Sequence, residues 1–237
     1  MQGSWFRAGA AAVVGVAAAV SLGSVVLRGH TRAQRLPAPA EAAAPAHPGA
    51  NVAVFAGGCF WGVQEVFEHV KGVKEAVSGY AGGAVASPSY EQVSSGETGH
   101  AESVRVVFDP AVISYQQLLQ VFFSVVHDPT QLDRQGPDEG PQYRSAIFYT
   151  TDEQRQAAQA YIAQLTRARV FKRPIVTQVA PLKSFYPAEA YHQDYALHHP
   201  YQPYIVINDA PKVAHLKQQF PDLYREYDGS ATARAGQ

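Results

Sequence analysis

Cys59 is the only cysteine among the 237 residues, and it lies in the segment 56–62, AGGCFWG. The segment separates an apolar run at 52–55 from a helical pattern of apolar residues at 63–70, which places Cys59 on or just before a first helical turn. Unpaired backbone N–H groups and the positive end of the helix dipole favour a thiolate there. A lone cysteine is often an inert core residue. Core packing, however, does not require glycines on both sides and the adjacent Phe60-Trp61 pair, so we interpret Cys59 as a nucleophile.

Alternating strand and helix signals without an internal repeat are expected to position this residue. The run 104–108 predicts a strand, and Ser114 with Gln117 resembles a capping box that begins a helix. That helix must end before the segment 127–129, because proline disfavours helical geometry in the residue before it. The other expected elements are strands at 145–149 and 175–179, a helix capped by Thr150 and Glu153 that runs to about Arg169, a loop at 131–142 and a short helix at 212–220. This order indicates an α+β fold with a mixed sheet and flanking helices.

The N-terminal region has a different character. Residues 8–27 form an uncharged run long enough to span a bilayer as a helix. Two readings compete for residues 1–33: a cleaved secretory signal peptide and an uncleaved signal anchor. Residues 34–50 are a Pro/Ala-rich linker, so we expect a catalytic domain at 51–224 and a flexible tail at 225–237. Export, to a periplasmic or membrane-anchored extracytoplasmic location, is favoured over a cytoplasmic one.

Composition and charge exclude several classes of partner. The chain is 46% hydrophobic and 16% charged, which suits a globular domain with a substantial core. From residue 51 onward there are 15 basic and 19 acidic residues and no basic run, so nucleic acid is not an expected partner. His192, His198 and His199 accompany a single cysteine and no HExxH spacing, so no metal site is expected.

Several further motifs together resemble a known family. They are 57–62 (GGCFWG), 79–83 (GYAGG), 95–102 (SGETGHAE), 136–145 (GPDEGPQYRS), 185–189 (FYPAE) and 191–193 (YHQ). In this order, between Val52 and Tyr224, they look like the signature blocks of the peptide methionine sulfoxide reductase A family. The resemblance implies a ferredoxin-like α/β sandwich and the reduction of methionine S-sulfoxide, peptide-bound or free, to methionine.

The resemblance also implies roles for the polar residues of the motifs. A sulfoxide has a partially positive sulfur and a partially negative oxygen, so its reduction needs a soft nucleophile at sulfur and acids at oxygen. Cys59 would be the nucleophile, and Glu102 the acid, kept protonated by an enclosed site. Tyr90 and Tyr143 would donate hydrogen bonds to the developing oxyanion. Asp138 would be the loop acid that orders the tyrosines or a water molecule.

The aromatic residues of the motifs would bind the substrate. Phe60 and Trp61 are expected to form an apolar wall for the methyl group, because aromatic rings make favourable contacts with sulfur and its substituents. Tyr80 and His100 are expected to be structural members of their loops.

The sequence departs from many family members in its supply of thiols. The glycine-rich C-terminal tail with resolving cysteines is missing, and Ser94 stands where many relatives have a cysteine. No intramolecular disulfide can form, so a sulfenic acid on Cys59 must be reduced by an external thiol, such as a thioredoxin-like protein. No prosthetic cofactor is expected, the substrates are methionine sulfoxide in oxidised proteins or free, and the protein is expected to be a monomer.

Two alternatives come from other functional classes. One is a cysteine hydrolase or acyl-transfer enzyme in which His100 or His192 acts as the base for Cys59. The other is a non-enzymatic thiol redox sensor. Turnover of free methionine sulfoxide with dithiothreitol separates these hypotheses from a reductase.

Overall fold

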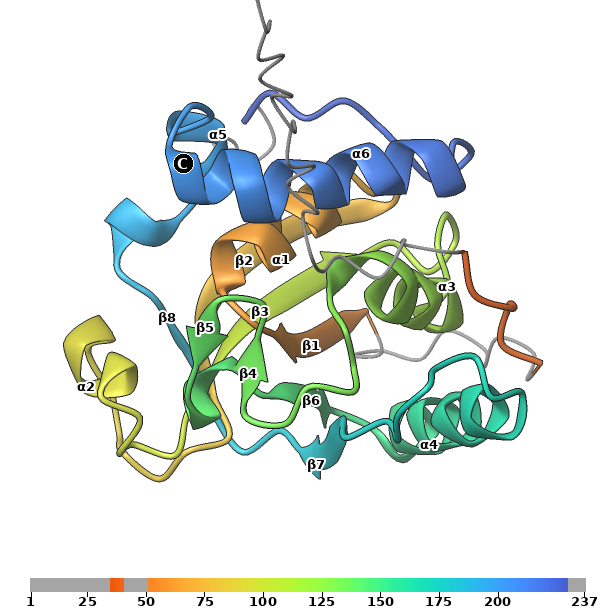
Figure 1. Cartoon of the computed structure of the whole chain (residues 1–237), viewed down its shortest axis with the longest axis horizontal. Coiled ribbons are helices and arrows are strands. Elements are labelled where there is room, and N and C mark those ends of the chain that lie inside the picture. The colour runs from red at the N-terminus through yellow and green to blue at the C-terminus, as the bar shows by residue number, and fades with distance from the viewer. Residues whose placement is uncertain (1–34, 41–50, 230–237) are drawn as a thin grey trace, which may run out of the picture. The chain divides into compact units, whose positions relative to one another are not determined.

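The computed structural model of the protein describes residues 35–40 and 51–229, which contain a six-stranded mixed sheet with flanking helices (Figure 1). The strand order is β7-β6-β1-β3-β2-β8, and every neighbouring pair is antiparallel except β6 and β7. The strands are β1 (Val52–Gly57), β2 (Val73–Ala81), β3 (Ala101–Phe108), β6 (Ser145–Tyr149), β7 (Gln178–Pro181) and β8 (Phe185–Pro187). The predicted α+β fold is confirmed.

Helices and short loop elements complete the domain. The α-helices are α1 (Phe60–Glu68), α2 (Tyr90–Ser94), α3 (Tyr115–Val121), α4 (Asp152–Arg167), α5 (Tyr195–His198) and α6 (Ala210–Gln219). π-Helical turns at Phe122–Val126 (η1) and Ile205–Asp209 (η4) extend α3 and precede α6. The 3-10 turns are η2 (Pro141–Tyr143) and η3 (Ala190–His192), and β4 (Arg134–Gln135) pairs with β5 (Asp138–Glu139).

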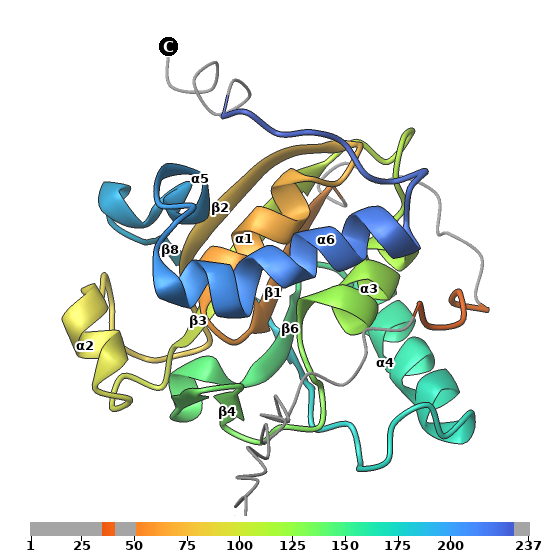
Figure 2. The same ribbon diagram turned by 45° about the horizontal axis from the view of Figure 1, so that its top comes forward.

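The central connectivity is that of a ferredoxin-like fold. The strands β1 and β2 both pair antiparallel with β3, so they run parallel to each other and α1 is the crossover between them. The strands β3 and β6 both pair antiparallel with β1, so they run parallel to each other, and α3 is part of the crossover between them. Figure 2 shows α1 and α3 on one face of the sheet, with α6 lying across α1.

Alternation along β1 builds two apolar layers. Phe55 faces the main core, where its ring stacks on Phe67 of α1 at 5.1 Å and on Phe122 of η1 at 4.9 Å. Val54 belongs to a smaller cluster with Phe148. Successive side chains of a strand point to opposite faces, so β1 is covered on both sides, and its C-terminal end is held firmly where Cys59 follows.

The predicted element boundaries hold with local exceptions. The capping box of Ser114 and Gln117 is confirmed. The N-cap of α4 is Thr151, whose hydroxyl accepts the Gln154 N–H at 3.3 Å, so the predicted cap pair was wrong by one residue. Strand β7 begins later than predicted, because the Val176 N–H donates to the Pro129 carbonyl at 2.8 Å instead of to the sheet.

Part of the predicted linker is docked on the catalytic domain. Residues 35–40 have no regular secondary structure, yet Leu36 is only 8% exposed and belongs to the main core. The Arg35 guanidinium lies 4.7 Å from the centroid of the Phe220 ring. The polar contacts are Leu36 N–H to Ser124 Oγ (3.1 Å), Gln120 Nε2 to Leu36 O (2.7 Å), Tyr161 O–H to Pro37 O (2.8 Å), Gln164 Nε2 to Ala38 O (2.8 Å) and Ala40 N–H to Gln164 Oε1 (2.8 Å).

The structure describes only part of each end of the chain. The uncharged run 8–27, on which the predicted signal peptide or anchor rests, lies outside the described residues. Within residues 35–40 and 51–229, no helix is long and apolar enough to cross a membrane. At the other end, Arg225 in the predicted tail donates from its backbone N–H to His69 O at 2.8 Å, and Tyr227 donates to Asp194 at 2.9 Å.

Leu36→Asp should undock the segment, because it replaces a buried apolar side chain with a charge. The lost burial of about 1–2 kcal/mol should lower the Tm by about 4 °C, and the amides that the segment covers should exchange faster. Calorimetry and hydrogen exchange measure both effects. Ala38→Asp, at an exposed neighbouring position, is the matched control, and equal melting of the two variants would contradict the docked arrangement.

Candidate active site

Cys59 is the N-cap of α1 and is 9% exposed. The strand β1 ends at Gly57, and Gly58 turns the chain with a φ of +94°, a conformation that favours glycine. A Cβ on Gly58 would lie 2.6 Å from Cγ of Gln135, and one on Gly57 would lie 3.1 Å from the side chain of Val126. The two glycines therefore let other segments pack closely around the turn that presents Cys59.

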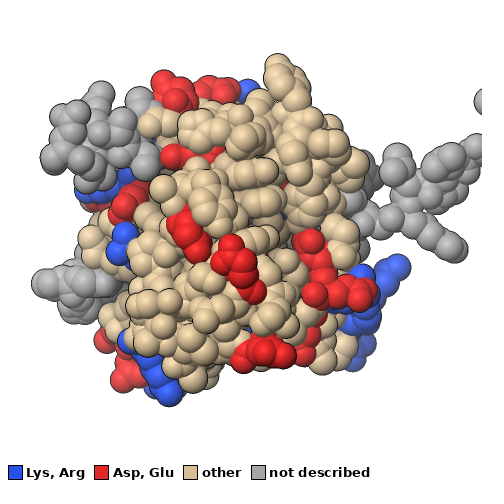
Figure 3. Space-filling model, turned by 90° about the vertical axis from the view of Figure 1, so that its left-hand side faces the viewer, with Lys and Arg blue, Asp and Glu red and all other residues tan. Residues whose placement is uncertain are grey.

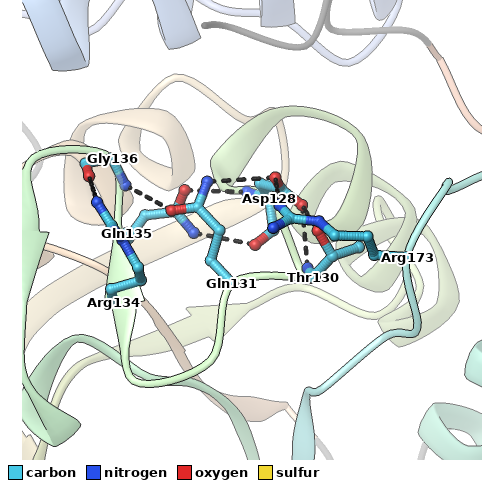
Figure 4. A network of polar contacts seen from close by, with 7 residues as sticks. All are labelled: Asp128, Thr130, Gln131, Arg134, Gln135, Gly136 and Arg173. Atoms are coloured by element: carbon cyan, nitrogen blue, oxygen red, sulfur yellow. Dashed lines mark hydrogen bonds and ion pairs between the residues drawn. The ribbon is translucent and has the colours of Figure 1, made fainter.

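A polar network holds the loop that packs on this turn (Figure 4). The Asp128 carboxylate accepts hydrogen bonds from Thr130 and Gln131 and pairs with Arg173 at 3.3 Å. The Gln135 side chain donates to the Asp128 carbonyl at 3.1 Å and accepts the Asp128 N–H at 3.2 Å. These hydrogen bonds fix the first half of the predicted loop at both of its ends. The loop places Gln135 against Gly58 and continues into Asp138 on β5.

Burial decides the protonation of the Cys59 thiol. It raises the pKa well above the ordinary value, and the Glu102 and Asp209 carboxyl groups raise it further. The Trp61 backbone N–H at the start of α1 and the Lys212 ammonium lower the pKa. The predicted position of Cys59 is confirmed, whereas the predicted thiolate was wrong for the resting protein, because desolvation outweighs the helix terminus.

Glu102 lies on β3 beside the start of α1. Glu102 is 1% exposed, and its Oε2 accepts the Phe60 N–H at 3.0 Å. Burial raises the pKa of Glu102 to about 8, an effect that outweighs this hydrogen bond. Glu102 is therefore mainly protonated at neutral pH, as an acid for the sulfoxide oxygen requires.

Tyr90 begins α2, and Tyr143 ends η2, so the two phenols come from different loops. The Tyr90 N–H donates to Glu189 Oε1 at 2.9 Å, which anchors the helix start. Burial raises the pKa of both phenols, and Glu102 and Cys59 raise it further, so the four groups lie within electrostatic range of one another. Both tyrosines are neutral hydrogen-bond donors at physiological pH.

Asp138 lies on β5 and makes a contact that the sequence did not predict. Its carboxylate accepts a short hydrogen bond from the O–H of Tyr204, a residue that the sequence motifs did not single out. Burial raises the pKa of Tyr204, and Cys59 is the next cause, which places this third phenol near the nucleophile. No sequence pattern pointed to Tyr204, because it lies in an aromatic-rich segment without periodicity.

Phe60 and Trp61 are part of a continuous group of rings. Phe60 lies 5.2 Å from His192, and Tyr90 lies 4.3 Å from His192, measured between ring centroids. Trp61 stacks on Tyr195 at 3.8 Å. The Trp61 indole N–H donates to His192 Nδ1 at 3.1 Å, so the proton of neutral His192 is on Nε2. The two predicted substrate-binding residues are thereby held in one orientation.

The histidines proposed as bases have other roles. His100 uses both ring nitrogens in loop contacts, with the Gly83 N–H at 3.1 Å and the Val85 carbonyl at 2.8 Å. Burial lowers the pKa of His192, whose Nδ1 is already occupied by Trp61. Neither ring offers a free basic nitrogen for Cys59, which counts against the hydrolase.

The remaining residues that the sequence analysis discussed lie in structural or exposed positions. Tyr80 donates to Glu189 at 2.9 Å and is buried beside Phe60, as expected of a structural residue. His198 and His199 are exposed. In the part of the chain that the structure describes, no group of three or more His, Cys, Asp or Glu residues is arranged to hold a metal ion.

The molecular face that carries α2, β8 and α5 is rich in carboxylates. Figure 3 shows Asp and Glu side chains spread over it, with Lys and Arg side chains near its edges. Such a face would repel a polyanion.

Comparison with known proteins identifies the family. Residues 51–224 match the family model described as peptide methionine sulfoxide reductase. The chain is 61% identical over 181 residues to peptide methionine sulfoxide reductase MsrA 2 of Mesorhizobium japonicum, covering 76% of this chain and 93% of that protein. It is 54% identical over 174 residues to the protein of the same name from Synechocystis, covering 73% of this chain and 81% of that protein.

Solved structures agree with this result. The crystal structure of reduced Mxr1 from Saccharomyces cerevisiae matches with a TM-score of 0.57 and 33% identity, over 64% of this chain and 86% of that one. Methionine sulfoxide reductase A of Corynebacterium diphtheriae matches with a TM-score of 0.58 and 34% identity, over 66% of this chain and 79% of that one. The chain, with its single thiol beside a buried acid and two phenols, belongs to the peptide methionine sulfoxide reductase family.

Proposed function

We propose that this protein reduces methionine S-sulfoxide, peptide-bound and free, to methionine, with Cys59 as the nucleophile. One observation carries the assignment of the site. The sole cysteine is next to a hydrogen bond that joins the Phe60 N–H to the buried carboxyl group of Glu102 at 3.0 Å. A soft nucleophile and a protonated acid are thus held together, as sulfoxide reduction requires.

The reaction moves one oxygen atom from substrate to enzyme. As the Cys59 sulfur loses its proton and attacks the sulfoxide sulfur, Glu102 gives a proton to the sulfoxide oxygen. Tyr90 and Tyr143 donate hydrogen bonds to that oxygen as its negative charge grows. Oxygen then passes to Cys59, so the thiol becomes a sulfenic acid and the sulfoxide becomes a thioether. The proton that Cys59 lost restores the acid, which balances the step.

The aromatic residues supply the apolar side of the site. Phe60 and Trp61 provide faces and edges for the S-methyl group, where sulfur and its substituents make favourable contacts. The hydrogen bond from Trp61 to His192 and the stacking on Tyr195 fix the indole before substrate arrives. A ring held in place loses little entropy on binding.

An external thiol closes the cycle. A first thiolate attacks the Cys59 sulfenic acid, which releases water and leaves a mixed disulfide, and a second thiol then frees Cys59. A thioredoxin-like protein has both thiols on one chain. If residues 8–27 direct export, the donor is also exported, and the protein acts as a monomer outside the cytoplasm.

An epimer-resolved assay tests the assignment. With dithiothreitol, the full chain should reduce the S-epimer of free methionine sulfoxide and leave the R-epimer, and Cys59→Ser should be inactive because an alcohol is too weak a nucleophile toward sulfur. Chiral chromatography of the products measures both. Activity of Cys59→Ser above a few percent of the wild-type rate would overturn the role of Cys59.

Glu102→Gln should lower the rate by on the order of 10²-fold, because the amide keeps the hydrogen bond from Phe60 but has no proton to transfer. In the wild type, kcat/KM should rise with pH as the Cys59 thiolate forms and level off above pH about 8, because ionisation of Glu102 then offsets the gain in thiolate. The variant has no Glu102 ionisation, so its kcat/KM should keep rising through this range. A wild-type rate for Glu102→Gln would show that another group is the acid.

A chain with one thiol cannot regenerate itself. Without reductant, the enzyme should form one equivalent of methionine and then stop, and its intact mass should rise by one oxygen atom. Addition of dithiothreitol should restart turnover. Rapid quench and mass spectrometry measure the burst, while steady turnover without any added reductant would contradict an external donor.

A further inference from the structure

A buried ion pair lies beside the first turn of α1, outside the groups assigned to the reaction so far. Lys212 Nζ is 2.9 Å from Asp209 Oδ1, and the side chain of Asp209 is 0% exposed and that of Lys212 is 17% exposed. Asp209 ends η4 and Lys212 lies in the first turn of α6. Burying two charges is costly unless they are paired, so such a pair is not an ordinary surface contact.

Gly62 is the residue that admits this pair. A Cβ on Gly62 would lie 2.0 Å from Asp209 Oδ1 and 2.7 Å from Lys212 Nζ. Gly62 lies three residues after Cys59, on the same first turn of α1. The last glycine of the segment GGCFWG therefore brings a carboxylate and an ammonium against the helix end that Cys59 caps.

The two charges affect that helix end in opposite ways. The N-terminus of a helix carries a partial positive charge, which favours a carboxylate and disfavours an ammonium. The Asp209 carboxylate has the charge that this helix end favours, and its Oδ1 accepts the hydrogen bond that holds Lys212 nearby. Because charges interact more strongly in a buried site than in water, both act on the Cys59 sulfur. The Lys212 ammonium lowers the pKa of Cys59, and the Asp209 carboxylate raises it.

We propose that Lys212 and Asp209 are positioning residues that set how readily Cys59 takes up negative charge, with Lys212 favouring the thiolate and Asp209 opposing it. The proposal rests on the role of Cys59 as the nucleophile. Asp209 acts more strongly on Cys59 than Lys212 does, so the pair as a whole favours the protonated thiol at rest, and Lys212 limits this effect as the sulfur becomes charged. A cation held at a fixed place needs no reorganisation when the sulfur becomes charged.

Other titratable groups face the pair and must be separated from it. Burial lowers the pKa of Lys212, whereas Asp209 raises it, and Cys59 and Asp138 on β5 raise it to a smaller extent. The net result is a raised pKa, so Lys212 is a cation. Burial raises the pKa of Glu65 on α1 to about 7, so this group gains charge in the neutral range. Burial lowers the pKa of His127, after η1, to about 3, so that ring stays neutral. Glu65→Gln therefore removes a nearby titration that could overlap that of Cys59.

The test is the pH dependence of Cys59 alkylation in the reduced full chain. Iodoacetamide modification is followed by intact mass from pH 6 to 11, alone and in the Glu65→Gln background. Lys212→Met should raise the midpoint by about one pH unit, which lowers the rate at pH 7 by about tenfold. Asp209→Asn should lower the midpoint, and Lys212→Arg, which keeps the charge, should stay near wild type.

A matched ion pair serves as the control. Asp152 and Arg155 on α4 have the same i,i+3 spacing, at 3.0 Å, but are more exposed. Arg155→Met should leave the alkylation midpoint unchanged. Thermal melting of each variant reports packing separately. Should Asp209→Asn fail to fold, the contrast between Lys212→Met and Lys212→Arg carries the test.

The outcomes separate this proposal from a purely structural role and from the proposed function. Midpoints that move in opposite directions for Lys212→Met and Asp209→Asn support it. Unchanged midpoints, or midpoints that move in the same direction, overturn it, whatever the melting temperatures. Alkylation needs no sulfoxide, so failure of the reductase assignment would appear in the epimer assay and leave this result intact.

Discussion

The hydrogen bond from the Phe60 N–H to Glu102 Oε2, at 3.0 Å, joins the two halves of the site. The first N–H groups of a helix have no intrahelical partner, so a buried helix start needs an acceptor from elsewhere. Here β3 supplies it, and the same contact fixes the acid one residue from the nucleophile. The rest of the fold serves this junction, since β1 and β3 are adjacent strands and α1 begins where β1 ends.

Burial of both groups determines the resting state. Desolvation raises the pKa of Cys59 and of Glu102, so near neutral pH the pair is mainly a thiol and a carboxylic acid. The productive form, with a thiolate and a protonated acid, is then a minor one, and the observed titration belongs to the pair more than to either residue. A neutral resting site is protected from adventitious oxidation, because the thiolate is the reactive form.

The sequence predicted the elements whose signals are local. The capping box of Ser114 follows from adjacent residues, and the place of Cys59 at the start of α1 follows from apolar periodicity. Strand β2 was missed, because its sequence mixes lysine, glutamate and glycine without clean alternation. The thiolate was wrongly predicted and the contact of Asp138 with Tyr204 was not foreseen, because each depends on distant segments: burial of Cys59 in one case and the position of Tyr204 in the other.

The glycines of the segment GGCFWG show why its motif requires the whole domain. Gly58 makes room for Gln135, which the Asp128 network holds, and Gly62 makes room for Asp209 and Lys212. The first contact comes from a loop more than seventy residues along the chain and the second from the C-terminal helix. Each glycine is therefore explained by a partner that local sequence cannot reveal. A substitution at Gly62 would disturb the ion pair before it disturbed α1, since the clash falls on the Asp209 carboxylate and the Lys212 ammonium.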